Sequence, residues 1–183
     1  AALSLAGIGP EKTRIRLFAA PEQKMNMHRI TVEGEFGRLA IEVEGFAGHA
    51  GTVPMNLRRD ALAAAAECVL AIERRCGRVA ELVGTVGRLE TLPGSVNVIP
   101  GKVCFTIDVR SPRDPERLAA VTEAVAEMQA IARRRNVAIK INKTHEGGVA
   151  ECAPWLMEQI GHAIALEGLP VRKLSSGAGH DGM

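Results

Sequence analysis

Two histidines of this sequence lie between glycines, where an imidazole could do chemistry. His49 lies in the loop at residues 48–55, and His180 lies in the small-residue segment 175–181. Glycine permits unusual φ angles and lets a ligand approach the backbone closely. An imidazole in such a loop can donate a hydrogen bond or titrate near neutral pH. The spacing alone fits a ligand-binding histidine and one that only fixes its own loop equally well.

Two further polar side chains are candidates for binding a substrate. Asn97 is an amide in the otherwise apolar linker 94–101, where a turn residue is the simpler interpretation. Asp108 and Arg110 end a strand pattern, on the face opposite Phe105. Arginine offers a planar fork that fits a carboxylate. The spacing by itself favours a surface ion pair between the two, which would contribute little stability.

The composition excludes several classes of protein. The 183 residues are 46% hydrophobic and 24% charged, which is typical of one globular domain, or of one domain with a fragment of another. A net charge of +2 and an aromatic content of 3% argue against nucleic acid and anionic membranes as partners. No apolar run approaches the roughly 20 residues of a membrane span.

The remaining histidines and the cysteines suggest no further site. Cys68, Cys76, Cys104 and Cys152 form no CxxC pair, so neither a zinc knuckle nor a thioredoxin motif is visible. We predict free thiols in a reducing cytoplasm. His28, His145 and His162 lack a glycine-rich setting; we interpret His162 as a helix residue and expect His28 and His145 on the surface.

The elements that must position these side chains follow a β-α-β-β-α-β order. We expect a strand at residues 38–44, a helix at 56–75, strands at 82–86 and 102–110, a helix at 114–135 and a strand at 137–141. Asn56 is the expected N-cap of the first helix. Asp114 with Pro115 marks the start of the second, and Asn136 fits the residue after its end. The expected core faces of the two helices are Leu62, Ala65, Val69, Ile72 and Leu118, Val121, Val125, Met128, Ala132.

This order predicts an α+β fold of the ferredoxin-like type, with two helices on one face of a four-stranded antiparallel sheet. Beyond residue 147 the pattern changes. Pro154 opens a further helix, and a short strand is expected at residues 171–174. The expected core face of that helix is Leu156, Ile160, Ala163 and Ile164. We interpret this part as a fragment of an α/β domain.

Five segments taken together resemble one family. They are GHAGTVPM at residues 48–55, RRDALAAAAE at 58–67, GTVGRLETLPGSVNVIPGKV at 84–103, DVRSP at 108–112 and SSGAGHD at 175–181. In this order they are similar to the N-carbamoyl-L-amino-acid hydrolase and allantoate amidohydrolase branch of the M20 metallopeptidase family. The resemblance covers roughly residues 34–183.

The resemblance implies a hydrolase of non-peptide C–N bonds with two domains. A catalytic α/β domain holds a two-metal site, and a ferredoxin-like lid inserted into it forms the interface of a homodimer. On this basis residues 37–147 are the lid and dimerisation domain, and residues 148–183 are a fragment of the catalytic domain. Residues 1–36 match poorly and are assigned to another fragment of the catalytic domain.

The resemblance also implies roles for the candidate residues. His49 matches a lid histidine that reaches the partner's active site and polarises the scissile carbonyl. Asn97 and Arg110 match lid residues that bind the substrate, a small molecule whose carboxylate Arg110 takes. His180 matches a catalytic-domain histidine near the substrate.

The family's metal ligands are absent from this sequence. It contains no His-x-Asp motif and no adjacent Glu-Glu pair. We therefore expect Zn²⁺, or Mn²⁺ or Co²⁺, only in the complete enzyme, with no ligand in this chain, and we expect the 183 residues alone to be inactive. The alternatives are a non-catalytic dimerisation or scaffold module, an M20 peptidase or deacylase relative, and a free-standing ferredoxin-like sensor.

Overall fold

The computed structural model describes residues 37–145, 149 and 151–176. Residues 1–36 and His180 lie outside the described residues, and the predicted domain boundaries stay predictions. The elements are β1 (Gly37–Glu44), β2 (Gly48–His49), η1 (Met55–Leu57), α1 (Ala61–Cys76), β3 (Val83–Leu92), β4 (Val98–Ile99), β5 (Lys102–Arg110), α2 (Asp114–Arg135), β6 (Ala138–His145) and α3 (Pro154–Leu166).

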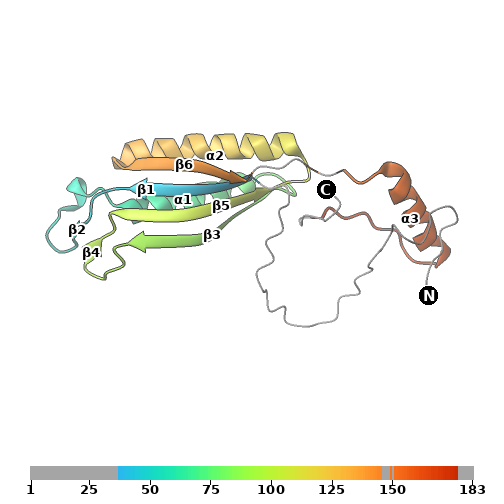
Figure 1. Cartoon of the computed structure of the whole chain (residues 1–183), viewed down its shortest axis with the longest axis horizontal. Coiled ribbons are helices and arrows are strands. Elements are labelled where there is room, and N and C mark those ends of the chain that lie inside the picture. Colours follow the sequence, from blue (N-terminus) through green and yellow to red (C-terminus); the bar gives the residue numbers. More distant parts are fainter. Residues whose placement is uncertain (1–36, 146–148, 150, 177–183) are drawn as a thin grey trace. The chain divides into compact units, whose positions relative to one another are not determined.

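Four of the strands form one sheet with the order β3-β5-β1-β6, in which every neighbouring pair is antiparallel. The helices α1 and α2 lie on the same side of this sheet (Figure 1). The helix α1 connects β1 to β3, and α2 connects β5 to β6. In neither case are the two connected strands neighbours in the sheet, and β5 and β1 are the two central strands. The predicted ferredoxin-like fold is confirmed.

The hydrophobic core lies between the sheet and the two helices. Alternate residues of β5 face it, and Val103, Phe105, Ile107 and Val109 are each at most 2% exposed. The intervening residues of β5 face the open side of the sheet. This alternation follows from the two-residue period of a strand. Because the core side of the sheet is closely packed, the strands that carry the open-face side chains are held rigidly.

The expected core faces of the two helices are confirmed in part. Ala65 and Ile72 of α1 and Met128 and Ala132 of α2 are buried as predicted, whereas Leu62 is 36% exposed and Leu118 is 43% exposed, so these two predictions were wrong. Ala61 and Ala64, which were not predicted, are buried beside Ala65. Small residues at the contact let the helix axis approach the sheet closely, and the larger leucines then lie at the border of the interface.

The helix α1 begins five residues after its predicted N-cap. Asn56 lies in the short turn η1, and the cap is Asp60, whose Oδ1 accepts hydrogen bonds from the backbone N–H groups of Leu62 (2.9 Å) and Ala63 (3.0 Å). At α2, Asp114 is the first helical residue rather than the N-cap. Asn136 ends that helix in the left-handed conformation, as predicted.

Replacing Asp60 by Ala should reduce the free energy of unfolding by about 1 kcal/mol, because two backbone donors of α1 lose their acceptor. Urea denaturation followed by circular dichroism measures the change. Asn56→Ala is the matched control and should change stability by no more than a few tenths of a kcal/mol. A larger loss for the Asn56 variant would contradict the capping assignment.

The part after the sheet domain contains one helix among the described residues. Pro154 opens α3 as predicted, but no residue of α3 is buried. The strand expected at residues 171–174 is absent, and Leu174 is 89% exposed. A strand needs a neighbour to accept and donate its backbone hydrogen bonds, and the described part of the chain provides none here.

The cysteines are free, as predicted. Cys68 and Cys76 are buried in the core. Burial raises the pKa of the Cys68 thiol to about 11. Within the described residues, no helix has the length and apolar character needed to cross a membrane.

Candidate functional site

His49 lies on a small two-stranded ribbon beyond one end of the main sheet (Figure 1). In this ribbon β2 pairs with β4, so that His49 lies opposite Val98. The backbone N–H of Ala50 donates to the carbonyl oxygen of Asn97 at 2.8 Å. Two candidate residues, far apart in sequence, are thus brought together, and the side chains of both are exposed.

A backbone hydrogen bond orients the His49 imidazole. The N–H of Gly51 donates to Nδ1 at 3.1 Å, so Nδ1 is an acceptor and the proton of the neutral ring belongs on Nε2. A Cβ atom at position 51 would lie 3.2 Å from His49 Cε1, so the imidazole would have to shift slightly to make room for it. The histidine therefore fixes its own loop and also presents an N–H donor at the tip of the ribbon.

Arg58 also stabilises this loop, through hydrogen bonds to two of its carbonyl groups. This role was not predicted from the sequence. Its Nε donates to the carbonyl of Val53 at 3.0 Å, and its Nη2 donates to the carbonyl of Ala50 at 2.6 Å. The available signal was a cation directly after a glycine- and proline-rich loop, whose backbone carbonyls need donors. Arg58 is thus a supporting residue for the position of His49.

Arg110 lies at the opposite end of the sheet. Lys102, at the start of β5, pairs with Glu44 near the ribbon, whereas Arg110 ends the strand beside Val83. Eight residue steps of about 3.3 Å separate the two ends by roughly 26 Å. The structure therefore does not bring Arg110 together with His49, and within one chain the two side chains cannot contact the same small molecule.

Arg110 is paired with Asp108, as its spacing suggested. Its Nε donates to Oδ1 of Asp108 at 2.9 Å and its Nη2 donates to Oδ2 at 3.0 Å. Arg38 of β1 donates its Nε to the same Oδ2 at 3.2 Å. Burial of Asp108 would raise the pKa of its carboxyl, but the two guanidinium groups outweigh this effect and lower it.

These side chains line a groove on the open face of the sheet. Its volume is about 590 Å³. All four strands contribute side chains, namely Arg38 from β1, Thr85 from β3, Thr106, Asp108 and Arg110 from β5, and Thr144 from β6. Two guanidinium groups against one carboxylate make the groove positive. It has the size and charge to hold a small anion such as a carboxylate.

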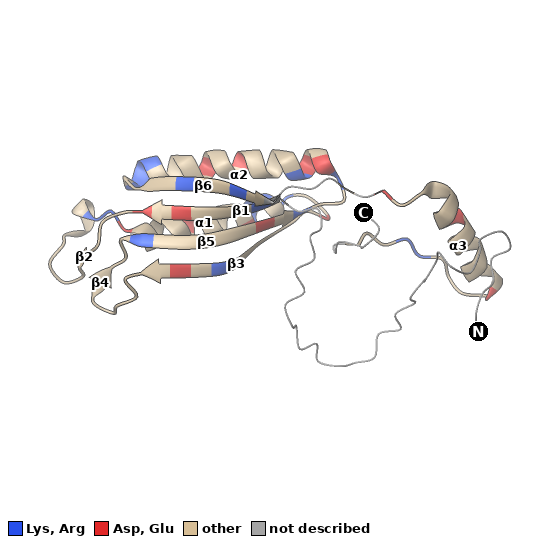
Figure 2. Cartoon of the chain, viewed as in Figure 1, with Lys and Arg blue, Asp and Glu red and all other residues tan. Residues whose placement is uncertain are grey.

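The other end of the open face is already neutralised. Lys102 and Lys140 contact Glu42 through their Nζ atoms at 2.6 Å and 3.0 Å. Charges of opposite sign lie side by side on neighbouring strands there (Figure 2). Hydrogen bonds from Lys102, and then from Lys140, lower the pKa of Glu42 from 4.5 to about 2. The excess of cations over carboxylates among the residues that line the groove therefore lies at the Arg110 end of this face.

The variant Glu42→Gln should lower stability at neutral pH and lose this effect in acid. A carboxyl whose pKa is lowered by folding stabilises the protein above its unfolded pKa, and the effect disappears as pH falls through the folded value. The difference in melting temperature from the parent should thus be constant above pH 4.5 and vanish towards pH 2. Thermal melts at stepped pH measure it, and a constant difference down to pH 2 would contradict the pairing.

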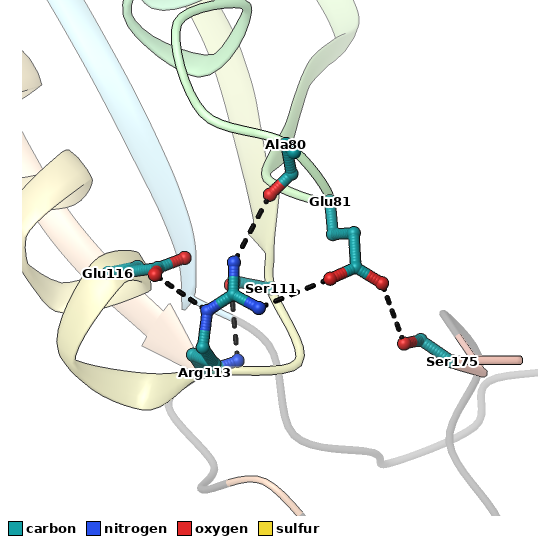
Figure 3. Close-up of polar contacts among 6 residues, drawn as sticks. All are labelled: Ala80, Glu81, Ser111, Arg113, Glu116 and Ser175. Atoms are coloured by element: carbon teal, nitrogen blue, oxygen red, sulfur yellow. Dashed lines mark hydrogen bonds and ion pairs between the residues drawn. The ribbon is translucent and has the colours of Figure 1, made fainter. Parts of the chain in front are cut away.

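The Arg110 end of the sheet is also linked to the segment that contains the second glycine-flanked histidine. Arg113 donates to Glu116 (2.6 Å), to Glu81 (3.1 Å) and to the carbonyl of Ala80 (3.4 Å) (Figure 3). Glu81 in turn accepts a hydrogen bond from the hydroxyl of Ser175 at 2.9 Å. Ser175 therefore contacts the sheet domain at the end where Arg110 lies, rather than at the end where His49 lies.

No group of three or more His, Cys, Asp or Glu side chains that could hold a metal ion occurs among the described residues. The side chains of this part of the chain therefore do not fit a metal centre. The chemistry available here consists of hydrogen-bond donation by His49 and Asn97 and anion binding by Arg110.

Comparison with known proteins gives a consistent relationship over most of the chain. The chain is 36% identical to allantoate deiminase 1 of Glycine max over 173 residues, which cover 80% of this chain and 36% of that protein. It is 37% identical to N-carbamoyl-L-amino acid amidohydrolase of Geobacillus stearothermophilus, covering 77% of this chain and 34% of that protein. The chain thus spans about a third of the length of these relatives.

A family model described as "Aspartate dehydrogenase, C-terminal" matches residues 1–69. This is less than half of the chain, and only residues 37–69 of it are described by the structure. The match ends within α1 and includes neither Asn97 nor Arg110. It therefore does not account for the sheet domain or for its candidate site.

Solved structures agree with the amidohydrolase relatives. A hydantoinase/carbamoylase family amidase from Burkholderia ambifaria has a TM-score of 0.76 and 31% identity, covering 82% of this chain and 37% of that one. The structure of AtUAH in complex with glyoxylate has a TM-score of 0.73 and 32% identity, covering 81% of this chain and 36% of that one. From its motifs, its fold and these relatives, the chain belongs to the family of N-carbamoyl-L-amino-acid hydrolases and allantoate amidohydrolases.

Proposed function

We propose that this chain supplies the lid, the dimer contacts and part of the substrate site of a hydrolase for linear amide or ureido C–N bonds. N-Carbamoyl amino acids and allantoate-like molecules are the substrate class, because relatives named for these activities share its motifs. The observation that carries the proposal is the placement of His49 and Arg110 at opposite ends of one sheet.

Arg110 binds the carboxylate of the substrate in the groove on the open face. The groove is positive and of suitable size. A carboxylate ligand, glyoxylate, is bound in the related structure of AtUAH, which supports an anion as the ligand here. A planar guanidinium binds a carboxylate with two parallel hydrogen bonds, and this geometry explains an arginine rather than a lysine.

His49 and Asn97 act on the substrate that is bound by the partner subunit. The Nε2–H of His49 donates to the oxygen of the scissile carbonyl, on which negative charge develops during attack by water. Asn97, which lies beside His49 on the ribbon, adds a second polar contact. Since β5 alone separates its Lys102 end, near this tip, from Arg110 by roughly 26 Å, one complete site draws on two subunits.

The edge strand β3 is the better candidate for the dimer contact. Its side chains Val83, Leu89 and Leu92 are 55%, 40% and 54% exposed, and the neighbouring helix α1 exposes Leu70 to 50%. The other edge strand, β6, contains exposed lysines such as Lys140, which disfavour pairing between sheet edges. An uncovered apolar edge of this kind is typical of a protein interface.

Symmetry then places the two halves of the site together. In a two-fold dimer, β3 pairs antiparallel with β3 of the partner. The β3 end at Val83 lies beside Arg110, and the end at Leu92 lies beside Lys102 near the ribbon. Antiparallel pairing therefore brings Arg110 of one subunit to the same end as His49 of the partner subunit.

A divalent metal ion in the complete enzyme would activate the attacking water. We propose that its ligands lie elsewhere in that enzyme, because this sequence contains no His-x-Asp motif and no adjacent Glu-Glu pair. His180, outside the described residues, is assigned to the neighbourhood of the substrate by resemblance alone. The chain by itself is expected not to bind Zn²⁺ at micromolar concentration, which isothermal titration calorimetry tests.

Complementation between two inactive variants tests the shared site. In the complete enzyme, His49→Ala and Arg110→Ala each remove one residue from every site of a homodimer. In the heterodimer, one site keeps both residues and the other loses both. A heterodimer purified through two different affinity tags should therefore regain about half of the parent activity, since one of two sites is intact. No recovery in a dimer of confirmed composition would show that both residues act on the same subunit's substrate, and the proposal would fail.

A further inference from the structure

We propose that Asp108 is a positioning residue that fixes the guanidinium of Arg110 for the substrate carboxylate, with Arg38 as its second anchor. This inference rests on the proposed function and adds two residues to the same site. It would make the groove a preassembled Arg38–Asp108–Arg110 clamp on the open face of the sheet.

The geometry of the pair is that of a fixed fork. Asp108 uses both carboxylate oxygens, and Arg110 uses its Nε and Nη2 atoms, at 2.9 Å and 3.0 Å. Two parallel hydrogen bonds between planar groups hold the guanidinium plane in one orientation. Asp108 therefore fixes the edge of the Arg110 guanidinium that carries Nε and Nη2.

An ordinary surface pair on the neighbouring strand provides the contrast. Arg88 and Glu90 of β3 have the same spacing of two residues, but both Arg88 nitrogens contact the single oxygen Oε1. Their side chains are 67% and 55% exposed, against 34% and 24% for Arg110 and Asp108. The partly buried pair in the groove is therefore more rigidly held than its spacing alone would predict.

Arg38 gives the clamp its charge. Asp108 and Arg110 together carry no net charge. Without a further cation, the carboxylate of Asp108 would repel the carboxylate of the ligand. Arg38 lies opposite Asp108 in the register of β1 and β5, and its Nε donates to Oδ2 at 3.2 Å. By formal count the three residues carry two positive charges and one negative charge, and Asp108 contacts both guanidinium groups and keeps them in place.

The test uses the complete enzyme and steady-state kinetics. Asp108→Asn keeps the size of the side chain but removes its charge. For a carboxylate substrate, KM should rise about tenfold, and kcat should stay within about threefold, because positioning acts on binding. For the analogue in which a carboxamide replaces the carboxylate, KM should not change, whereas a general structural defect would affect both substrates.

Two further variants make the result specific. Glu90→Gln is the matched control, since it removes the acid from an arginine pair of the same spacing, and it should leave KM unchanged. Arg38→Gln changes a surface side chain that is 41% exposed, and it should raise KM for the carboxylate about threefold. It tests the clamp independently if Asp108→Asn does not fold, as judged by its melting curve.

A double-mutant cycle distinguishes this inference from the proposed function. Asp108→Asn should add nothing to Arg110→Ala if it acts through that arginine. An unchanged KM in both clamp variants, an additive effect in the cycle, or an equal loss for the carboxamide would overturn the positioning role. If Arg110→Ala itself leaves KM unchanged, the proposed carboxylate site is wrong, and the positioning role falls with it.

Discussion

The variant His49→Ala of the complete enzyme is expected to lower kcat by about 10²–10³-fold and to change KM less than threefold. The hydrogen bond from Gly51 to Nδ1 leaves Nε2–H as the donor. This donor interacts more strongly with an oxygen that gains negative charge than with a neutral carbonyl, so its loss falls on the chemical step. Steady-state kinetics at saturating substrate measure the effect.

Two substitutions at the same position separate the donor from the loop. His49→Asn keeps an acceptor for the Gly51 N–H but lacks the reach of Nε2, so it should be as slow as His49→Ala. His49→Gln places an amide N–H near the position of Nε2 and should recover part of kcat. His162→Ala, an exposed histidine of α3, is the control and should behave like the parent. Near-normal turnover of His49→Ala would remove this residue from the mechanism.

The variant Arg110→Ala is expected to raise KM for a carboxylate substrate by about 100-fold. Two hydrogen bonds to a charged group are lost, each worth about 1.5–3 kcal/mol, and a 100-fold change corresponds to about 2.7 kcal/mol. Arg110→Lys should recover only part of this loss, because an ammonium group cannot form the fork. Initial rates across a wide range of substrate concentration give the KM values.

The matched control is a cation on the same face and the same strand. Lys102 lies at the other end of β5, where it is paired with Glu42. Lys102→Met should therefore leave KM for the carboxylate unchanged, although it removes the same formal charge. If both variants raised KM equally, the effect would be one of overall charge, and Arg110 would have no specific role.

Local patterns in the sequence determined most of the sheet domain. The strict alternation in β5 predicted which side chains enter the core, because the period of a strand needs no tertiary information. Proline at the start of α2 and Asn136 at its end were also sufficient, since both act through their own backbone angles. Residue type and spacing marked His49 and Arg110 only as candidates, and the resemblance to the family suggested their roles.

Only the tertiary structure decided how these parts are used. The choice of Asp60 over Asn56 as helix cap, and of alanines over Leu62 at the contact, depends on where the sheet lies. The pairing of β2 with β4, which places Asn97 beside the His49 ribbon, joins segments about fifty residues apart. The separation of that ribbon from Arg110 follows from the length of β5 and its register with β1. Such distances depend on long-range hydrogen bonding and packing, which local propensity does not encode.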